Sequence, residues 1–137
     1  MRLPHTDPQG ELMAYYETVY IIRADLTTEQ IEQIIARMKD IITANSGQVL
    51  KTELWGRRQL AYPVKKNSKG FYVFHVVEGK GQLISNLEER MKLDEDILKF
   101  QTIRIASLPQ YSSPLAVGDD RRDNYAEGEE VAVGNNA

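Results

Sequence analysis

The chain has 137 residues, no cysteine and a formal net charge of −3. This length suits one domain with its own core, which typically needs about 100 to 150 residues. The lack of cysteine excludes disulfides, thiolate metal sites and cysteine nucleophiles, and it fits a reducing compartment. No apolar run approaches the ~20 residues that span a bilayer, and the start does not read as a secretory signal, so we expect a soluble protein with no membrane partner.

One segment of this acidic chain is strongly basic. Residues 51–70 carry a net charge of +5, whereas residues 1–50 carry −3, residues 71–118 carry −1 and residues 119–137 carry −4. Attraction to phosphate depends on the local field, so a pI of 5.4 does not exclude a nucleic-acid partner. The balance does argue against a protein that coats nucleic acid over its whole surface.

The start of the chain changes character near residue 14. Residues 1–13 contain two prolines and a glycine without a hydrophobic period, and we expect them to be a disordered extension, with Met13 as a hypothetical start. Residues 15–23 are rich in Tyr, Val and Ile, which predicts a strand. Both alternating faces of this strand carry bulky groups. We therefore expect helices on one side of the sheet and a partner or the tail on the other.

A helix is predicted over residues 25–47. Its apolar stripe consists of Ile31, Ile34, Ile35, Met38, Ile41 and Ile42. Thr27 and Gln30 have the spacing of a capping box, and Gly47 stands where a left-handed residue would end the helix.

A long hairpin is predicted next. Residues 48–64 read as one strand and residues 71–78 as the next, with turn residues at 67–70 between them. Pro63 cannot donate a hydrogen bond to a central ladder, which places the first of these strands at an edge of the sheet. An edge strand is also available for pairing with another molecule.

The remaining elements complete an α+β pattern. Residues 81–93 predict a shorter amphipathic helix, residues 94–96 a turn and residues 97–106 a strand. The order βαββαβ is that of a ferredoxin-like domain, a four-stranded antiparallel sheet with two helices on one face, here over residues 14–107. Residues 108–137 hold too little apolar surface to order and predict a disordered acidic tail.

The uninterrupted run Trp-Gly-Arg-Arg-Gln-Leu-Ala-Tyr-Pro at residues 55–63 resembles the family of the sixth protein of the bacterial small ribosomal subunit. Tyr16-Glu17, Lys66 and Gly70 before an aromatic strand extend the resemblance, which covers about residues 13–107. It implies a ferredoxin-like fold and a structural role in the cytoplasmic ribosome. It further implies binding to a junction in the central domain of small-subunit ribosomal RNA, together with the eighteenth protein of that subunit as heterodimer partner. Neither a cofactor nor a small-molecule substrate is expected.

The candidate RNA-binding residues are cations on the hairpin, at the end of the second helix and on the last strand. They are Arg57, Arg58, Lys65, Lys66, Lys69, Lys92, Lys99 and Arg104. Arg57 and Arg58 are adjacent, so they point to opposite faces unless a bulge at Gly56 re-aims them. One guanidinium would contact phosphate and the other a partner or a carboxylate. Alternatively these cations are solvated charges, and Lys92 complements its helix dipole.

The candidate residues for the protein partner are Trp55, Gln59 and Tyr62. Aromatic rings can stack on bases, but the sheet lacks the paired aromatic residues of an RNA-recognition motif. We therefore expect Trp55 and Tyr62 to pack at the hairpin or against the partner.

Other functions have weaker support in the sequence. His75 lies mid-strand without a neighbouring carboxylate and reads as a packed histidine, while residues 94–96 lack the spacing of a calcium loop and read as a turn. An acyl-phosphate hydrolase on the same fold would need a phosphate-binding loop after the first strand, and residues 24–28 contain no glycine. A ligand-sensing domain that dimerises through its sheet is a further alternative. We predict no catalytic residue and no metal site.

Overall fold

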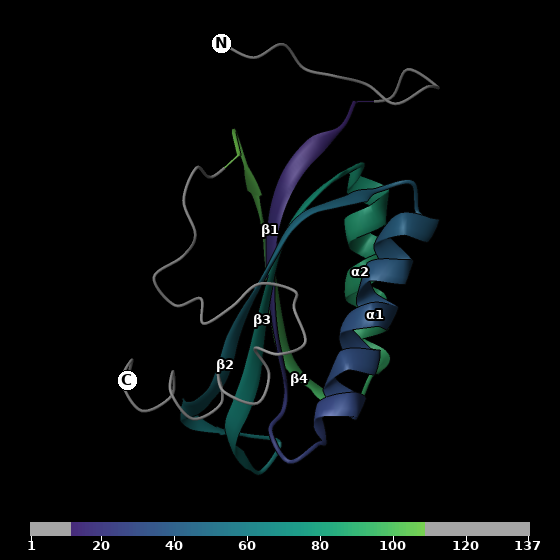
Figure 1. Cartoon of the computed structure of the whole chain (residues 1–137). Coiled ribbons are helices and arrows are strands. Elements are labelled where there is room, and N and C mark those ends of the chain that lie inside the picture. Colours follow the sequence, from purple (N-terminus) through teal and green to yellow (C-terminus); the bar gives the residue numbers. More distant parts are fainter. Residues whose placement is uncertain (1–11, 109–137) are drawn as a thin grey trace.

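The computed structural model describes residues 12–108 (Figure 1). The two segments predicted to be disordered, 1–13 and 108–137, fall outside the described residues except at Leu12, Met13 and Leu108. The elements are β1 (Ala14–Arg23), α1 (Thr28–Ala44), β2 (Gln48–Val64), β3 (Asn67–Gly79), α2 (Gly81–Leu93) and β4 (Ile97–Ile105). This order confirms the predicted ferredoxin-like α+β fold.

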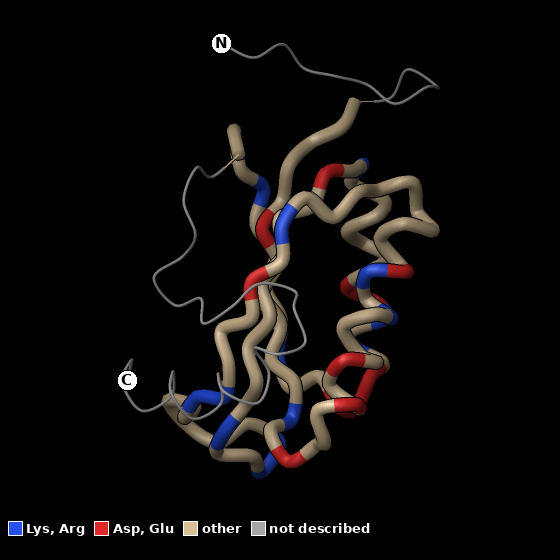
Figure 2. Tube along the Cα trace, viewed as in Figure 1, with Lys and Arg blue, Asp and Glu red and all other residues tan. Residues whose placement is uncertain are grey.

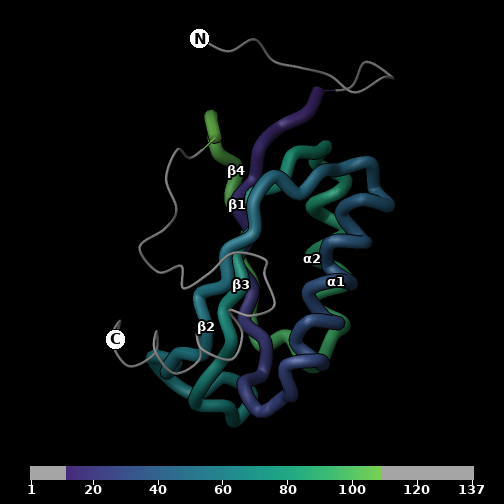
Figure 3. The backbone as a smooth tube through the Cα atoms, viewed as in Figure 1, coloured from purple at the N-terminus to yellow at the C-terminus, as the bar shows by residue number. Residues whose placement is uncertain are grey.

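All three pairings in the sheet are antiparallel, and the strand order is β2-β3-β1-β4. Both helices cover the same face of the sheet (Figure 1 and Figure 3). The edges are therefore β2 and β4, which confirms the edge position that Pro63 predicted for β2.

Helix α1 begins with the predicted capping box. The Gln30 backbone N–H donates to Thr27 Oγ1 over 3.2 Å, and the Thr27 backbone N–H donates to Gln30 Oε1 over 2.9 Å. At the other end the prediction was wrong, because the left-handed residue is Ser46, with φ 66°, and not Gly47. Gly47 instead permits close packing, since a Cβ there would lie 2.5 Å from Leu83 Cδ2.

The main core lies between the helices and the sheet. Its fully buried members include Tyr20, Ile22, Ile31, Ile42, Leu54, Phe71, Leu83, Leu87, Met91 and Ile97. The predicted stripe of α1 is buried except at Ile41, which packs against the core from its margin. This face therefore follows the helical period of the sequence.

A buried polar cluster surrounds His75 within this core. Its Nε2 lies 2.9 Å from the Tyr20 hydroxyl and its Nδ1 lies 2.9 Å from Thr52 Oγ1, and the side chain has no exposed surface. Burial, together with the charge of Lys39 on α1, lowers the pKa of His75 to about 3. The neutral ring is a packed core histidine, as the sequence predicted.

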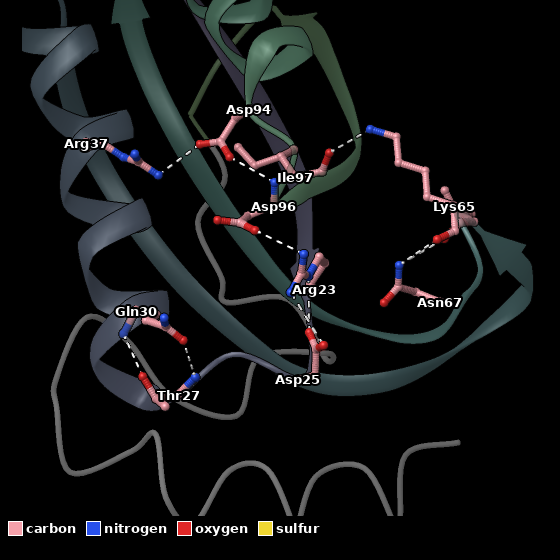
Figure 4. Close-up of polar contacts among 11 residues, drawn as sticks. Arg23, Asp25, Thr27, Gln30, Arg37, Lys65, Asn67, Asp94, Asp96 and Ile97 are labelled. Atoms are coloured by element: carbon pink, nitrogen blue, oxygen red, sulfur yellow. Dashed lines mark hydrogen bonds and ion pairs between the residues drawn. The ribbon is translucent and has the colours of Figure 1, made fainter.

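The β2–β3 hairpin turns earlier than predicted. Its two turn residues are Lys65 and Lys66, with φ of 50° and 68°, and β3 already begins at Asn67. The predicted turn at residues 67–70 was wrong because lysine rarely adopts positive φ, whereas Asn, Ser and Gly are common in turns. The Asn67 amide supports the turn by donating to the Lys65 carbonyl over 2.9 Å (Figure 4).

Strand β2 is irregular in three places. Its register against β3 shifts between Val49 and Lys51, between Leu54 and Gly56, and between Gln59 and Val64. Gly56 has φ 81°, so the second shift is the bulge that the sequence had raised as an alternative. The third shift contains Pro63, whose missing N–H costs nothing where the ladder is already interrupted.

Candidate nucleic-acid and partner interface

The distal part of the hairpin, residues 59–70, is called the basic arm below. Lys65 Nζ at its tip donates to the Ile97 carbonyl over 3.5 Å (Figure 4). Lys99 Nζ lies 3.4 Å from the Tyr62 hydroxyl and 5.4 Å from the centre of its ring. Because β2 and β4 are opposite edges of the sheet, these contacts show that the basic arm reaches back to the far edge.

An apolar cluster holds the basic arm in this position. Ile21 of β1, Leu60 of the arm and Leu98 of β4 are each less than a tenth exposed and pack together, with Val64 and Tyr72 beside them. The cluster is separate from the main core. Burial of its apolar surface therefore fixes the arm without help from the helices.

The basic arm and β4 gather four of the predicted RNA contacts. Lys65, Lys66 and Lys69 are exposed on the arm, and Lys99 of β4 lies against Tyr62 of the arm. Blue Lys and Arg segments cluster at the far end of this hairpin, whereas the densest group of red Asp and Glu segments lies near the lower ends of the helices (Figure 2). The sequence did not predict that Lys65 and Lys99 lie on neighbouring segments, because they are far apart in the chain. A concentrated positive field of this kind attracts phosphate.

The two adjacent arginines have different surroundings. Arg57 pairs with Phe71, and its guanidinium donates to the Ala24 carbonyl over 3.0 Å and to the Leu26 carbonyl over 3.1 Å. It also lies 5.6 Å from the centre of the Phe71 ring. These contacts join β2 to the β1–α1 loop on the helix side of the sheet.

Arg58 pairs with Gly70 instead, and its Nε donates to the Trp55 carbonyl over 3.2 Å. Successive strand residues point to opposite faces, so Arg58 belongs to the face that carries the basic arm. The two arginines thus make different contacts, and their division between the two faces follows from strand alternation after the bulge at Gly56. This division leaves Arg58 as the arginine better placed for phosphate.

Two of the predicted RNA contacts lie away from the basic arm. Lys92 is exposed in the last turn of α2, in the helix layer. Arg104 pairs with Tyr16 near the start of β1, whereas Gly70 of the arm pairs with Arg23 at its end. Seven strand residues separate these positions, or about 23 Å. The structure therefore does not bring Arg104 together with the lysines of the arm.

The predicted partner residues also separate. Trp55 Nε1 donates to Glu53 Oε1 over 2.9 Å, and its ring stacks on Phe74 with centroids 5.3 Å apart. This confirms that Trp55 packs at the hairpin. Gln59 is exposed opposite Lys69. Tyr62 is 62 % exposed within the third register shift, so it is not buried in the hairpin, and its expected packing against the partner stays a prediction.

The acidic residues after α2 form a structural turn. Asp94 Oδ2 accepts from Arg37 over 2.9 Å, and Asp94 Oδ1 accepts from the Asp96 backbone N–H over 2.9 Å (Figure 4). Asp96 Oδ1 forms an ion pair with Arg23 Nη1 at 3.5 Å. Within residues 12–108 no group of three or more His, Asp or Glu side chains could hold a metal ion. Neither helix of that range is long and apolar enough to cross a membrane.

The β1–α1 loop also has a structural role. The carbonyls of Ala24 and Leu26 accept from Arg57, and Arg23 forms an ion pair with Asp25 at 3.2 Å. A phosphate-binding loop would instead direct several N–H groups at one point. With its buried neutral histidine, its paired acidic turn and its basic arm, the domain has the construction of a binding scaffold and not of a catalyst.

Comparison with known proteins identifies the scaffold. A family profile described as ribosomal protein S6 matches residues 15–104. The small ribosomal subunit protein bS6 of Magnetococcus marinus is 55 % identical over 109 residues, which are 80 % of this chain and 76 % of that protein. The bS6 protein of Azorhizobium caulinodans is 38 % identical over 109 residues, covering 80 % and 73 %.

A solved structure agrees with the sequence comparisons. The crystal structure of ribosomal protein S6 from Thermotoga maritima superposes with a TM-score of 0.65 and 31 % identity, covering 68 % of this chain and 88 % of that one. The chain belongs to the ribosomal protein S6 family of the small ribosomal subunit. This membership confirms a structural, non-enzymatic protein of the bacterial cytoplasm and excludes the hydrolase alternative.

Sequence reasoning missed two features of the site. Nothing in the sequence predicted the contact between the basic arm and β4, because Leu60 and Leu98 have the pattern of ordinary strand residues. The exposure of Tyr62 could have been predicted, since the neighbouring Pro63 marks an interrupted hydrogen-bond ladder.

Proposed function

We propose that this protein binds small-subunit ribosomal RNA through its basic arm while it pairs with the eighteenth protein of the same subunit, and that the pair stabilises the central domain during assembly. The observation that carries the RNA part is that the arm with the exposed Lys65, Lys66 and Lys69 reaches β4, where Lys65 contacts the Ile97 carbonyl and Lys99 contacts Tyr62. Arg58 extends this surface along β2. Release of counterions from the RNA would supply most of the affinity.

Trp55 and Gln59 support the protein part of the proposal. The stack on Phe74 and the hydrogen bond to Glu53 fix the half-buried Trp55 ring at the edge strand. A rigid aromatic residue binds a partner at low entropic cost, and the exposed Gln59, four residues further along the same edge strand, can hydrogen-bond. Tyr62, which the sequence assigned to the same partner, lies further out among the lysines.

Lys92 and Arg104 remain proposed RNA contacts of lower rank. Each is exposed, but neither shares the surface formed by the basic arm. An RNA junction that contacted them as well would have to extend past the helix end or along the sheet. Their removal should therefore weaken binding less than removal of the arm lysines.

Titration of a central-domain RNA transcript, with and without the eighteenth protein, tests the proposal. We expect tight binding only when both proteins are present, with an affinity that falls steeply as salt rises. Substitution of Lys65, Lys66 and Lys69 by Gln should abolish most of this binding, whereas Arg90→Gln on the exposed side of α2 should not. Absence of the chain from small subunits sedimented at moderate salt would refute the proposal.

A further inference from the structure

Tyr62 is a large side chain that the fold leaves uncovered. It is one of the few large hydrophobic residues that are more than half exposed in the described part of the chain, at 62 %. The register shift between Gln59 and Val64 places it outside the regular ladder. Neighbouring Ala61 and Pro63 are exposed as well. Burial in this domain therefore does not account for the aromatic ring.

The position of the ring is nevertheless well determined. Leu60, two residues before it, is buried against Ile21 and Leu98. Lys65, three residues after it, is tied to the Ile97 carbonyl. Since both flanks are held, the backbone that carries the ring needs little reordering when a ligand binds it, which favours binding.

The surroundings of the ring fit a nucleotide. The Lys99 ammonium lies 5.4 Å from the ring centre and 3.4 Å from the hydroxyl oxygen, so it borders the ring at its hydroxyl end. Lys65 and Lys66, the two residues of the hairpin turn, follow Tyr62 within four residues and are exposed. A planar ring bordered by lysines presents a surface for a base together with charges for the adjoining phosphates.

We propose that Tyr62 stacks on an unpaired base of the bound RNA, with Lys99 holding the adjoining phosphate. The proposal rests on the RNA-binding function proposed above and adds a base-contacting residue to it. A protein partner would gain the same apolar ring but would leave the lysine cluster without anionic partners. The charge around the ring therefore favours RNA over protein as the occupant.

Salt titration separates stacking from phosphate contact. The probe is the central-domain transcript of small-subunit ribosomal RNA, bound by the chain together with the eighteenth protein. Tyr62→Leu should lower affinity about ten-fold without changing the slope of log affinity against log salt, because stacking releases no counterion. Tyr62→Phe should keep affinity within about two-fold, since the ring remains. Lys66→Gln should reduce the slope instead.

The outcomes distinguish this inference from the function on which it rests. If wild type and Tyr62→Leu bind the transcript equally well, only the stacking contact is overturned. A salt slope of Tyr62→Leu that differs from that of wild type would overturn it as well. Weaker binding of Tyr62→Leu to the eighteenth protein without RNA would assign the ring to the protein partner. A wild-type pair that does not bind the transcript would overturn the proposed function itself.

A measurement on the wild-type protein guards against misfolding of the variants. Ultraviolet irradiation of the complex should cross-link Tyr62 to a base, and mass spectrometry would locate the linked peptide. Cross-links confined to other parts of the chain would contradict the stacking contact whatever the variants show.

Discussion

The two faces of the sheet are stabilised by different means. The helix-covered face buries a continuous apolar core around the uncharged His75 cluster. The opposite face has a small cluster of Ile21, Leu60 and Leu98, above which an irregular, cationic arm is held by a few contacts to β4. Stability therefore comes mainly from the first face, and the candidate binding surface lies on the second.

Removal of core volume should have the largest effect on this comparison. Ile42 is completely buried on the core-facing side of α1, so Ile42→Ala should cost about 3 kcal/mol of unfolding free energy. Leu60→Ala should cost about 2 kcal/mol, because its cluster is smaller. Urea unfolding followed by Trp55 fluorescence measures both. Folded Ile42→Ala should keep its RNA affinity, whereas Leu60→Ala should lose affinity as the basic arm loosens.

The His75 cluster makes the helix-covered face sensitive to acid. Burial lowers the pKa of His75 from 6.5 to about 3 in the folded state. The contribution of the neutral His75 ring to the free energy of unfolding is therefore complete above pH 6.5 and declines as the pH falls toward 3. Between pH 6.5 and 5 the loss should be about 2 kcal/mol. His75→Gln should be less stable at pH 7 but should lack this part of the pH dependence. An equal change in unfolding free energy between these two pH values for wild type and His75→Gln would show that His75 is not the source of the acid sensitivity.

The two arginines test the comparison at neighbouring positions. Arg57→Ala leaves the Ala24 and Leu26 carbonyls without their donor and should cost about 1 to 2 kcal/mol. Arg58→Ala should change stability little but weaken assembly onto RNA. Thermal unfolding and RNA titration of both variants measure the two effects. Unchanged RNA affinity of the two-protein complex would remove Arg58 from the site.

Charge removal on each face should give the smallest effect. Lys66→Gln on the basic arm should lower affinity a few-fold and reduce the salt slope by about one unit. Arg90→Gln, which removes the same charge from exposed α2, should change neither. Equal slopes for the two variants would show that the arm has no special role in phosphate contact.

Local patterns were sufficient for most of the fold. The period of the apolar residues placed α1 and α2 correctly, because one face of each helix must be buried. Pro63 placed β2 at an edge because a central ladder needs the N–H that proline lacks. The hairpin turn was misplaced because Lys65 and Lys66 adopt positive φ only with the support of Asn67 and the paired strands.

The candidate site depended more on tertiary structure. Its cations were visible as a charged segment, but the sequence could not separate Arg57, which holds the β1–α1 loop, from Arg58 beside it. Nor could it separate Trp55, which stacks on Phe74, from the exposed Tyr62. In each pair the residue type is the same or similar. Strand alternation separates the two arginines, and the register shift between Gln59 and Val64 sets Tyr62 apart from Trp55.

By itself the sequence determined the order of the elements, the face that the helices bury and the concentration of positive charge in one segment. These properties follow from period, residue type and local charge, all of which act over short stretches of chain. Only the tertiary structure decided that the basic arm reaches β4 and that Lys99 joins its lysines around Tyr62. That arrangement depends on apolar contacts between residues far apart in the chain, which no local pattern encodes.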